Sequence, residues 1–200
     1  MTIVDNSTYG PATNSNFTNM PTDSSVWFWT SAEYKGNTSY AYSFYPYYGY
    51  YFVSAASAYS KTKTYKVLCV SGNEIQPATS ANFMTETISG SVVVTDSATG
   101  LMWQKTYEEK TWQEALSYCE DSTYAGYYDW RLPNKNELAS LVNYEKSEAP
   151  YSYFPDMPSE YFWSSSTDVH DTNAWGVDFN RGYVISSSGK TNYSYVRCVR

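Results

Sequence analysis

A phrase that occurs twice constrains the fold of this chain most strongly. "MPTDSSVWFWTSAEY" begins at residue 20 and "MPSEYFWSSST" begins at residue 157. Residues 17–21 match residues 154–158 without a gap, and Trp29 then matches Trp163. Self-similarity of this kind is the signature of a repeated structural unit, which has to be resolved before a fold is assigned.

The two copies stay in step toward their C-terminal ends. The spacing from Ala41 to Gly49 equals that from Ala174 to Gly182, and Cys69 matches Cys198 after a short insertion in the first copy. Going backwards, residues 3–4 match residues 141–142, but nothing before them corresponds to residues 92–140. We therefore predict the C-terminal half of a first repeat over residues 1–72, a linker over residues 73–90 and a complete repeat over residues 91–200.

Within the complete repeat, the patterns predict a hairpin, two helices and then short strands. "GSVVVTDSATGLMWQK" is typical of a hairpin with a turn at residues 96–100. Thr111 with Glu114, and Asn134 with Glu137, have the spacing of capping boxes that begin two helices. The segments "YFWSSS", "AWGVDF", "YVISSS" and "YVRCVR" follow as strands. The predicted class is α+β, with two helices and a small antiparallel sheet in each unit and an incomplete first repeat.

The composition indicates a folded chain and argues against two kinds of partner. Aromatic residues make up 19% of the chain and charged residues only 16%, whereas disordered chains are poor in aromatic residues. The net charge of -7 and the absence of a basic stripe argue against nucleic acid. We find no apolar run long enough for membrane insertion and no export signal at the N-terminus, so any such signal is expected to lie outside this sequence.

The repeat indicates how the three cysteines could pair. A bond between Cys119 on the first predicted helix and Cys198 on the last strand would close a long loop and stabilise the unit by about 4 kcal/mol. Cys69 is the counterpart of Cys198, but the helix that would carry its partner belongs to the absent half, so we expect Cys69 to pair outside this chain segment. The alternative is that all three are buried free thiols of a cytosolic protein.

Five ordered motifs resemble one family. "TGLMWQK", "TWQEALSYC", "YYDWRLPNKNEL", "YFWSSST" and "YVRCVR" are similar to the Lcl C-terminal domain family of bacterial surface proteins. The resemblance implies a C-type-lectin-like fold, related to the formylglycine-generating-enzyme branch, in exported adhesins or repeat modules. It also implies a disulfide between Cys119 and Cys198.

Two properties of that family and fold are not expected here. One member class binds sulfated glycans through a basic trimer surface, and the acidic balance of this chain argues against binding a polyanion. The enzyme branch needs a pair of nearby cysteines for copper, but each unit here has one cysteine near its C-terminus. We therefore predict that the chain is not an enzyme and needs no cofactor.

Aromatic and amide side chains of the C-terminal half form the predicted ligand-binding set. Flat rings beside amides and hydroxyls suit stacking and hydrogen bonding to a sugar or to a protein. The alternative is that alternate strand residues are core, above all Trp163 and Trp175. The set consists of Asn173, Trp175, Asn180, Arg181, Tyr183, Asn192 and Tyr193.

The loop "TDVHDTN" offers a second candidate site. Asp168, Asp171 and Asn173 carry oxygen atoms at a spacing that could hold calcium, although short acidic loops are usually only solvated. His170, the only histidine, is interpreted as a solvated loop residue. The Tyr-rich segment at residues 40–52 is interpreted either as a half-buried strand pair or as a surface for protein contact.

Two functional hypotheses follow. In the first, the chain is an extracellular, bacterial cell-surface module that binds a glycan or a surface protein through its C-terminal loops. In the second, it is a structural repeat of a stalk or fibre, whose half repeat is completed by an upstream segment or by another copy through self-association. A lectin-like scaffold for variable display is a third, more distant option.

Overall fold

The computed structural model describes residues 26–33, 37–45, 50–51, 58–69, 82–143, 145–146, 148–150, 152–168 and 172–200. Several predicted residues lie outside this part of the chain. They include the repeat positions at residues 3–4, 17–21 and 49, part of the Tyr-rich segment (46–49 and 52), residues 73–81 of the predicted linker, and the loop residues His170 and Asp171.

The predicted hairpin is confirmed, and an unpredicted strand lies beside it. β6 (Ser91–Asp96) pairs antiparallel with β7 (Met102–Gln104). In the turn, the Asp96 carboxylate accepts hydrogen bonds from the Ala98 amide at 2.9 Å and from the Thr99 hydroxyl at 2.6 Å. β5 (Phe83–Ile88) pairs with β6 over its whole length, inside the predicted linker of residues 73–90. The pattern missed β5 because its four central residues are all exposed, so no apolar alternation marks it.

Both predicted helices are present and begin where their caps indicated. In α1 (Trp112–Glu120), the Glu114 carboxylate accepts the Thr111 amide at 3.0 Å. α2 (Lys135–Ala139) begins after Asn134, whose side-chain oxygen accepts two amides of the first turn at 2.9 and 3.0 Å. Within the described residues, no helix has the length and apolar character that crossing a bilayer requires.

The predicted C-terminal strands form one sheet. β12 pairs with β9 in parallel, while the other neighbouring strands are antiparallel. Gly176 lets β10 pass close to β9, because a Cβ at that position would lie 2.2 Å from the carbonyl oxygen of Phe162. In spatial order the strands are β11 (Tyr183–Gly189), β10 (Asn173–Asp178), β9 (Tyr161–Thr167), β12 (Ser194–Val196) and β8 (Glu108–Lys110).

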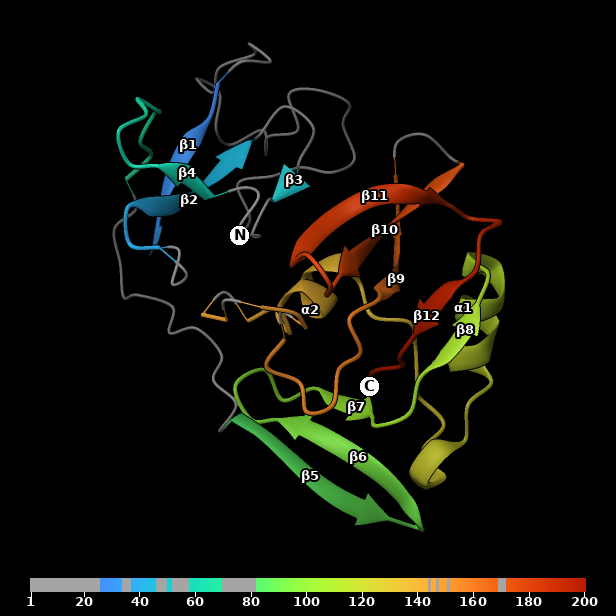
Figure 1. Cartoon of the computed structure of the whole chain (residues 1–200). Helices are drawn as coiled ribbons and strands as arrows, with labels where there is room; N and C mark the ends of the chain where they lie inside the picture. The colour runs from blue at the N-terminus through green and yellow to red at the C-terminus, as the bar shows by residue number, and fades with distance from the viewer. Residues whose placement is uncertain are drawn as a thin grey trace.

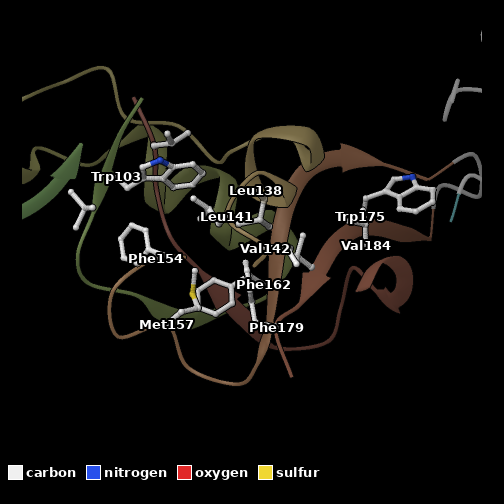
Figure 2. Packing of buried hydrophobic residues seen from close by; sticks show 13 residues of the cluster. Trp103, Leu138, Leu141, Val142, Phe154, Met157, Phe162, Trp175, Phe179 and Val184 are labelled. Carbon is white, nitrogen blue, oxygen red and sulfur yellow. The ribbon is translucent and has the colours of Figure 1, made fainter. Parts of the chain in front are cut away.

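Two hydrophobic clusters cover opposite faces of this sheet. Phe162 and Trp163 are successive residues of β9 and belong to different clusters, as alternation along a strand requires. The first cluster joins α2 to the sheet and to β7, and Figure 2 shows its side chains, including Leu138 and Trp103. The second joins α1 to the opposite face. All the residues of both clusters lie between residues 83 and 199, so this part of the chain has a core of its own.

A disulfide joins Cys119 to Cys198 inside the second cluster, as predicted. It connects α1 to the residues that follow β12. Cys69 is a free, exposed thiol in this chain, so the alternative of three buried free thiols is wrong.

The N-terminal strands extend the large sheet (Figure 1). β2 pairs with β1, β3 and β4, and β3 pairs with β11.

In the Tyr-rich segment, Ala41 and Ser43 of β2 are buried, which favours the half-buried strand interpretation. Within the described residues the class is mixed α+β, mostly sheet with two α-helices, as predicted. The N-terminal strands are β1 (Phe28–Glu33), β2 (Tyr40–Tyr45), β3 (Tyr50–Tyr51) and β4 (Ala58–Ser60).

The pairing of β1 with β2 has the same register as the pairing of β9 with β10. Trp29 faces Ser43, as Trp163 faces Gly176. Glu33 then faces Ala41 as Thr167 faces Ala174, with the same irregularity between the two pairs.

The next pairs continue this correspondence. Tyr45 faces Tyr50 as Asp178 faces Tyr183. Phe28 forms a parallel bridge with Lys66, and Phe162 pairs in parallel with Tyr195 in the same way. Each pair occupies positions that the sequence match makes equivalent.

Candidate functional site

The structure divides most of the predicted ligand-binding residues between the two ends of strand β10. Asn173 begins β10 and faces Gly189, close to Asn192. Asn180 and Arg181 lie in the turn at the other end of β10. The length of β10 separates the two ends by roughly 17 Å at 3.3 Å per residue. Tyr193 therefore belongs with Asn173 and Asn192, whereas Tyr183 belongs with the turn.

Trp175 lies between these ends and is only 2% exposed. Its indole packs in the first cluster, with the Lys135 ammonium 4.6 Å from the ring centroid. Trp163 is fully buried as well, and its indole N–H donates to the Lys110 carbonyl at 3.0 Å. Both rings therefore have the core position that was the alternative interpretation, and neither offers a stacking surface.

The polar groups of the β10–β11 turn are bonded to one another. The buried carboxylate of Asp178 accepts the Asn180 amide at 2.9 Å and the Arg181 amide at 3.2 Å. It also accepts the Arg181 guanidinium at 2.9 Å. The Arg181 side chain therefore has a local structural role, whereas Asn180 takes part through its backbone amide.

The acidic loop provides one described carboxylate. Asp168 accepts the Ser186 hydroxyl at 2.9 Å. Among the residues with described positions, no group of three or more His, Cys, Asp or Glu side chains is arranged to hold a metal. Asp171 lies outside them, so calcium binding at Asp168 and Asp171 remains a prediction.

An open groove lies beside Tyr193. It has a volume of about 480 Å³ and runs between β8 and the outer face of α1. We call it the α1–β8 groove. Its lining residues are Glu109, Lys110, Gln113, Glu114, Ser117, Tyr118 and Tyr193.

The helix is fixed beside the Tyr193 loop by its first residue. The Trp112 indole N–H donates to the Ser164 carbonyl at 2.8 Å, and the Trp112 amide donates to the Lys190 carbonyl at 3.1 Å. The Lys190 ammonium lies 4.5 Å from the centroid of the same ring. These contacts hold α1 against the turn that leads to Tyr193.

Helical periodicity explains which residues of α1 line the groove. Gln113 and Ser117 are one turn apart and lie on one face, whereas Ala115 and Cys119 are buried on the other. Tyr193 is 62% exposed, so its ring is open to a ligand.

Local contacts affect three of the ionisable side chains that line the groove. Hydrogen bonds from the Thr111 amide, at 3.0 Å, and from its hydroxyl, at 2.8 Å, lower the pKa of Glu114. Burial raises the pKa of Tyr118, so its hydroxyl stays protonated. The Lys110 ammonium lies 5.4 Å from the centroid of the Tyr118 ring. Two carboxylates and one ammonium give the lining a slight negative charge, which disfavours polyanions.

This lining suits an uncharged ligand rich in hydroxyl groups. Two tyrosine rings offer apolar surface with a polar edge, and Gln113 and Ser117 offer hydrogen-bond donors and acceptors. The sequence prediction included Tyr193 but missed the residues of α1 and β8. The helical spacing of "TWQEALSYC" is a signal that could have placed Gln113 and Ser117 on the outer face, but it carries no sign that Tyr193 lies beside them.

A model of the Lcl C-terminal domain matches residues 92–200. The chain belongs to the Lcl C-terminal domain family. The family resemblance predicted from the motifs is thereby confirmed, and the matched Lcl C-terminal domain contains the whole α1–β8 groove and both cysteines of the disulfide. No curated protein matches the chain.

Proposed function

We propose that this chain is an extracellular, non-catalytic module of a bacterial surface protein that adheres to a glycan through the α1–β8 groove. The groove carries the proposal, because Tyr118 and Tyr193 flank it and its other side chains are polar. The Cys119–Cys198 disulfide supports an extracellular location, since such bonds persist in oxidising compartments. A C-type-lectin-like fold is part of the proposal and rests on family membership.

Retention on immobilised glycans tests this proposal. The probe is a panel of neutral and sulfated oligosaccharides, and we expect the unaltered chain to retain neutral members in preference to sulfated ones. Tyr193→Ala should weaken retention about fivefold, because stacking by one ring is worth about 1 kcal/mol. Gln113→Ala should weaken it as well, through the loss of an amide.

The matched control replaces the turn residues at the other end of β10. Asn180→Ala combined with Arg181→Ala should leave retention unchanged. Loss of retention in this control, with Tyr193→Ala unaffected, would assign binding to the turn and contradict the groove. Retention of no neutral glycan would reject glycan adhesion itself.

A second candidate function is a structural repeat of a stalk or fibre, in which another segment completes residues 26–69. Val67 is 67% exposed, whereas Val196, its counterpart in the sequence match, is fully buried against α1. Cys69 is exposed, whereas its counterpart Cys198 is buried. This function requires an additional hairpin and helix to cover the exposed positions, whereas adhesion through the groove does not.

A further inference from the structure

The contact between β3 and β11 joins equivalent positions. Tyr51 faces Val184 in an antiparallel pair. In β2–β3, Tyr51 faces Phe44, as Val184 faces Val177 in β10–β11. Tyr51 is therefore the counterpart of Val184 by register as well as by sequence.

An antiparallel contact between equivalent residues has two-fold symmetry. Each strand presents the same edge to the other, which makes the contact isologous. The strand order β1-β2-β3-β11-β10-β9 reads as the same three strands from either end, with the symmetry axis between β3 and β11. Figure 1 shows the N-terminal strands continuing the sheet beyond β11.

We propose that the β11 edge is a self-complementary docking edge, whose partner is the equivalent strand of a second unit. In this chain the half repeat occupies the edge with β3. A strand edge with unpaired amides and carbonyls is a template for such pairing, and the partner of matching register is another β11.

The docking edge and the groove lie at opposite sides of the sheet. β11 and β8 are the two outer strands of the complete unit. Docking through β11 therefore leaves the α1–β8 groove open. The inference is independent of what the groove binds, so failure of one proposal does not affect the other.

Cysteine cross-linking tests the contact in the whole chain first. With Cys69→Ser as background, Tyr51→Cys combined with Val184→Cys should form a disulfide within one chain, because facing residues in an antiparallel pair have Cα atoms about 5 Å apart. Failure of this bond to form under mild oxidation would overturn the proposal at its starting point.

The symmetry is tested in residues 82–200, which contain their own core and disulfide. With β3 removed, Val184→Cys should link to Val184→Cys of a second copy, since each faces the other across the axis. Ile185→Cys is the matched control. It faces residue 183 of the second copy and lies roughly 8 Å from its own counterpart, too far for a disulfide.

We expect Val184→Cys to form the dimer at least tenfold faster than Ile185→Cys. A mixture of Tyr183→Cys and Ile185→Cys should form a heterodimer that neither forms alone. Equal rates for Val184→Cys and Ile185→Cys, or a Val184→Cys unit that stays monomeric, would overturn the proposal. An unchanged circular dichroism spectrum for each variant establishes that the unit is folded.

Discussion

Arg197 is 1% exposed and carries its charge into the core. Its guanidinium donates to the carbonyl oxygens of Gln104 at 2.9 Å and Lys105 at 2.5 Å, and lies 4.2 Å from the centroid of the Phe154 ring. Burial lowers its pKa to about 9, so it is still charged at neutral pH. Within the described residues no carboxylate forms an ion pair with it, so carbonyls and rings stabilise the cation.

Replacing this residue tests how much its bonds contribute. Arg197→Met should lower the free energy of unfolding by about 2 kcal/mol, because two buried carbonyl oxygens lose their donor. Urea unfolding at pH 7 measures the change. Lys63→Met, at an exposed position, is the control and should change the free energy by less than about 0.5 kcal/mol. A variant at Arg197 as stable as the unaltered chain would mean that the cost of burying the charge cancels its bonds.

At the scale of elements, the start of α2 is stabilised by a charged side chain in its first turn. Glu137 accepts both guanidinium nitrogens of Arg131, at 2.7 and 2.8 Å, and the Asn134 amide at 2.9 Å. Burial raises the pKa of Glu137, but the bonds from Arg131 and Asn134 outweigh burial and lower it overall. The unfolded chain therefore binds a proton at a higher pH than the folded chain does.

This shift sets the direction of a pH effect. The stability that Glu137 contributes is present above the ordinary glutamate pKa and is lost as the pH falls through its lowered folded value. Glu137→Gln should therefore lower the free energy of unfolding by about 1 kcal/mol at pH 7 and by less at pH 3. Urea unfolding at both pH values measures this difference. Glu86→Gln, at an exposed position of β5, is the control, and an equal loss at both pH values would contradict the assignment.

The elements differ in how far sequence could predict them. Helix starts were predictable because the caps of α1 and α2 are set by residues three positions apart. β5 was not, because its side chains face solvent and its strand character comes from pairing with β6. The groove could not be predicted in full, since Tyr118 and Tyr193 meet only after β12 has folded against β8.

At the scale of the whole molecule, residues 67–69 are exposed, whereas Val196 and Cys198, the counterparts of Val67 and Cys69 in the sequence match, are buried. The sequence match predicts that residues 1–72 are the C-terminal half of a repeat, whose other half an upstream segment or another copy would supply. On this prediction, the missing half would carry a helix with a cysteine. We expect non-reducing peptide mapping of the native protein to link Cys69 to a segment resembling "TWQEALSYC". A free Cys69 beside an intact Cys119–Cys198 bond would contradict completion and leave adhesion as the function.

The disulfide also determines how the unit responds to a pulling force. Cys198 lies two residues before Arg200, so tension that enters through Arg200 passes across the sulfur bridge to Cys119. The two cysteines are 79 positions apart, and the residues between them, which include α2 and the strands β9 to β12, are bypassed by that force and cannot be stretched out. Under such a load only the residues before Cys119 would lengthen, and Tyr193 would stay inside the bypassed span.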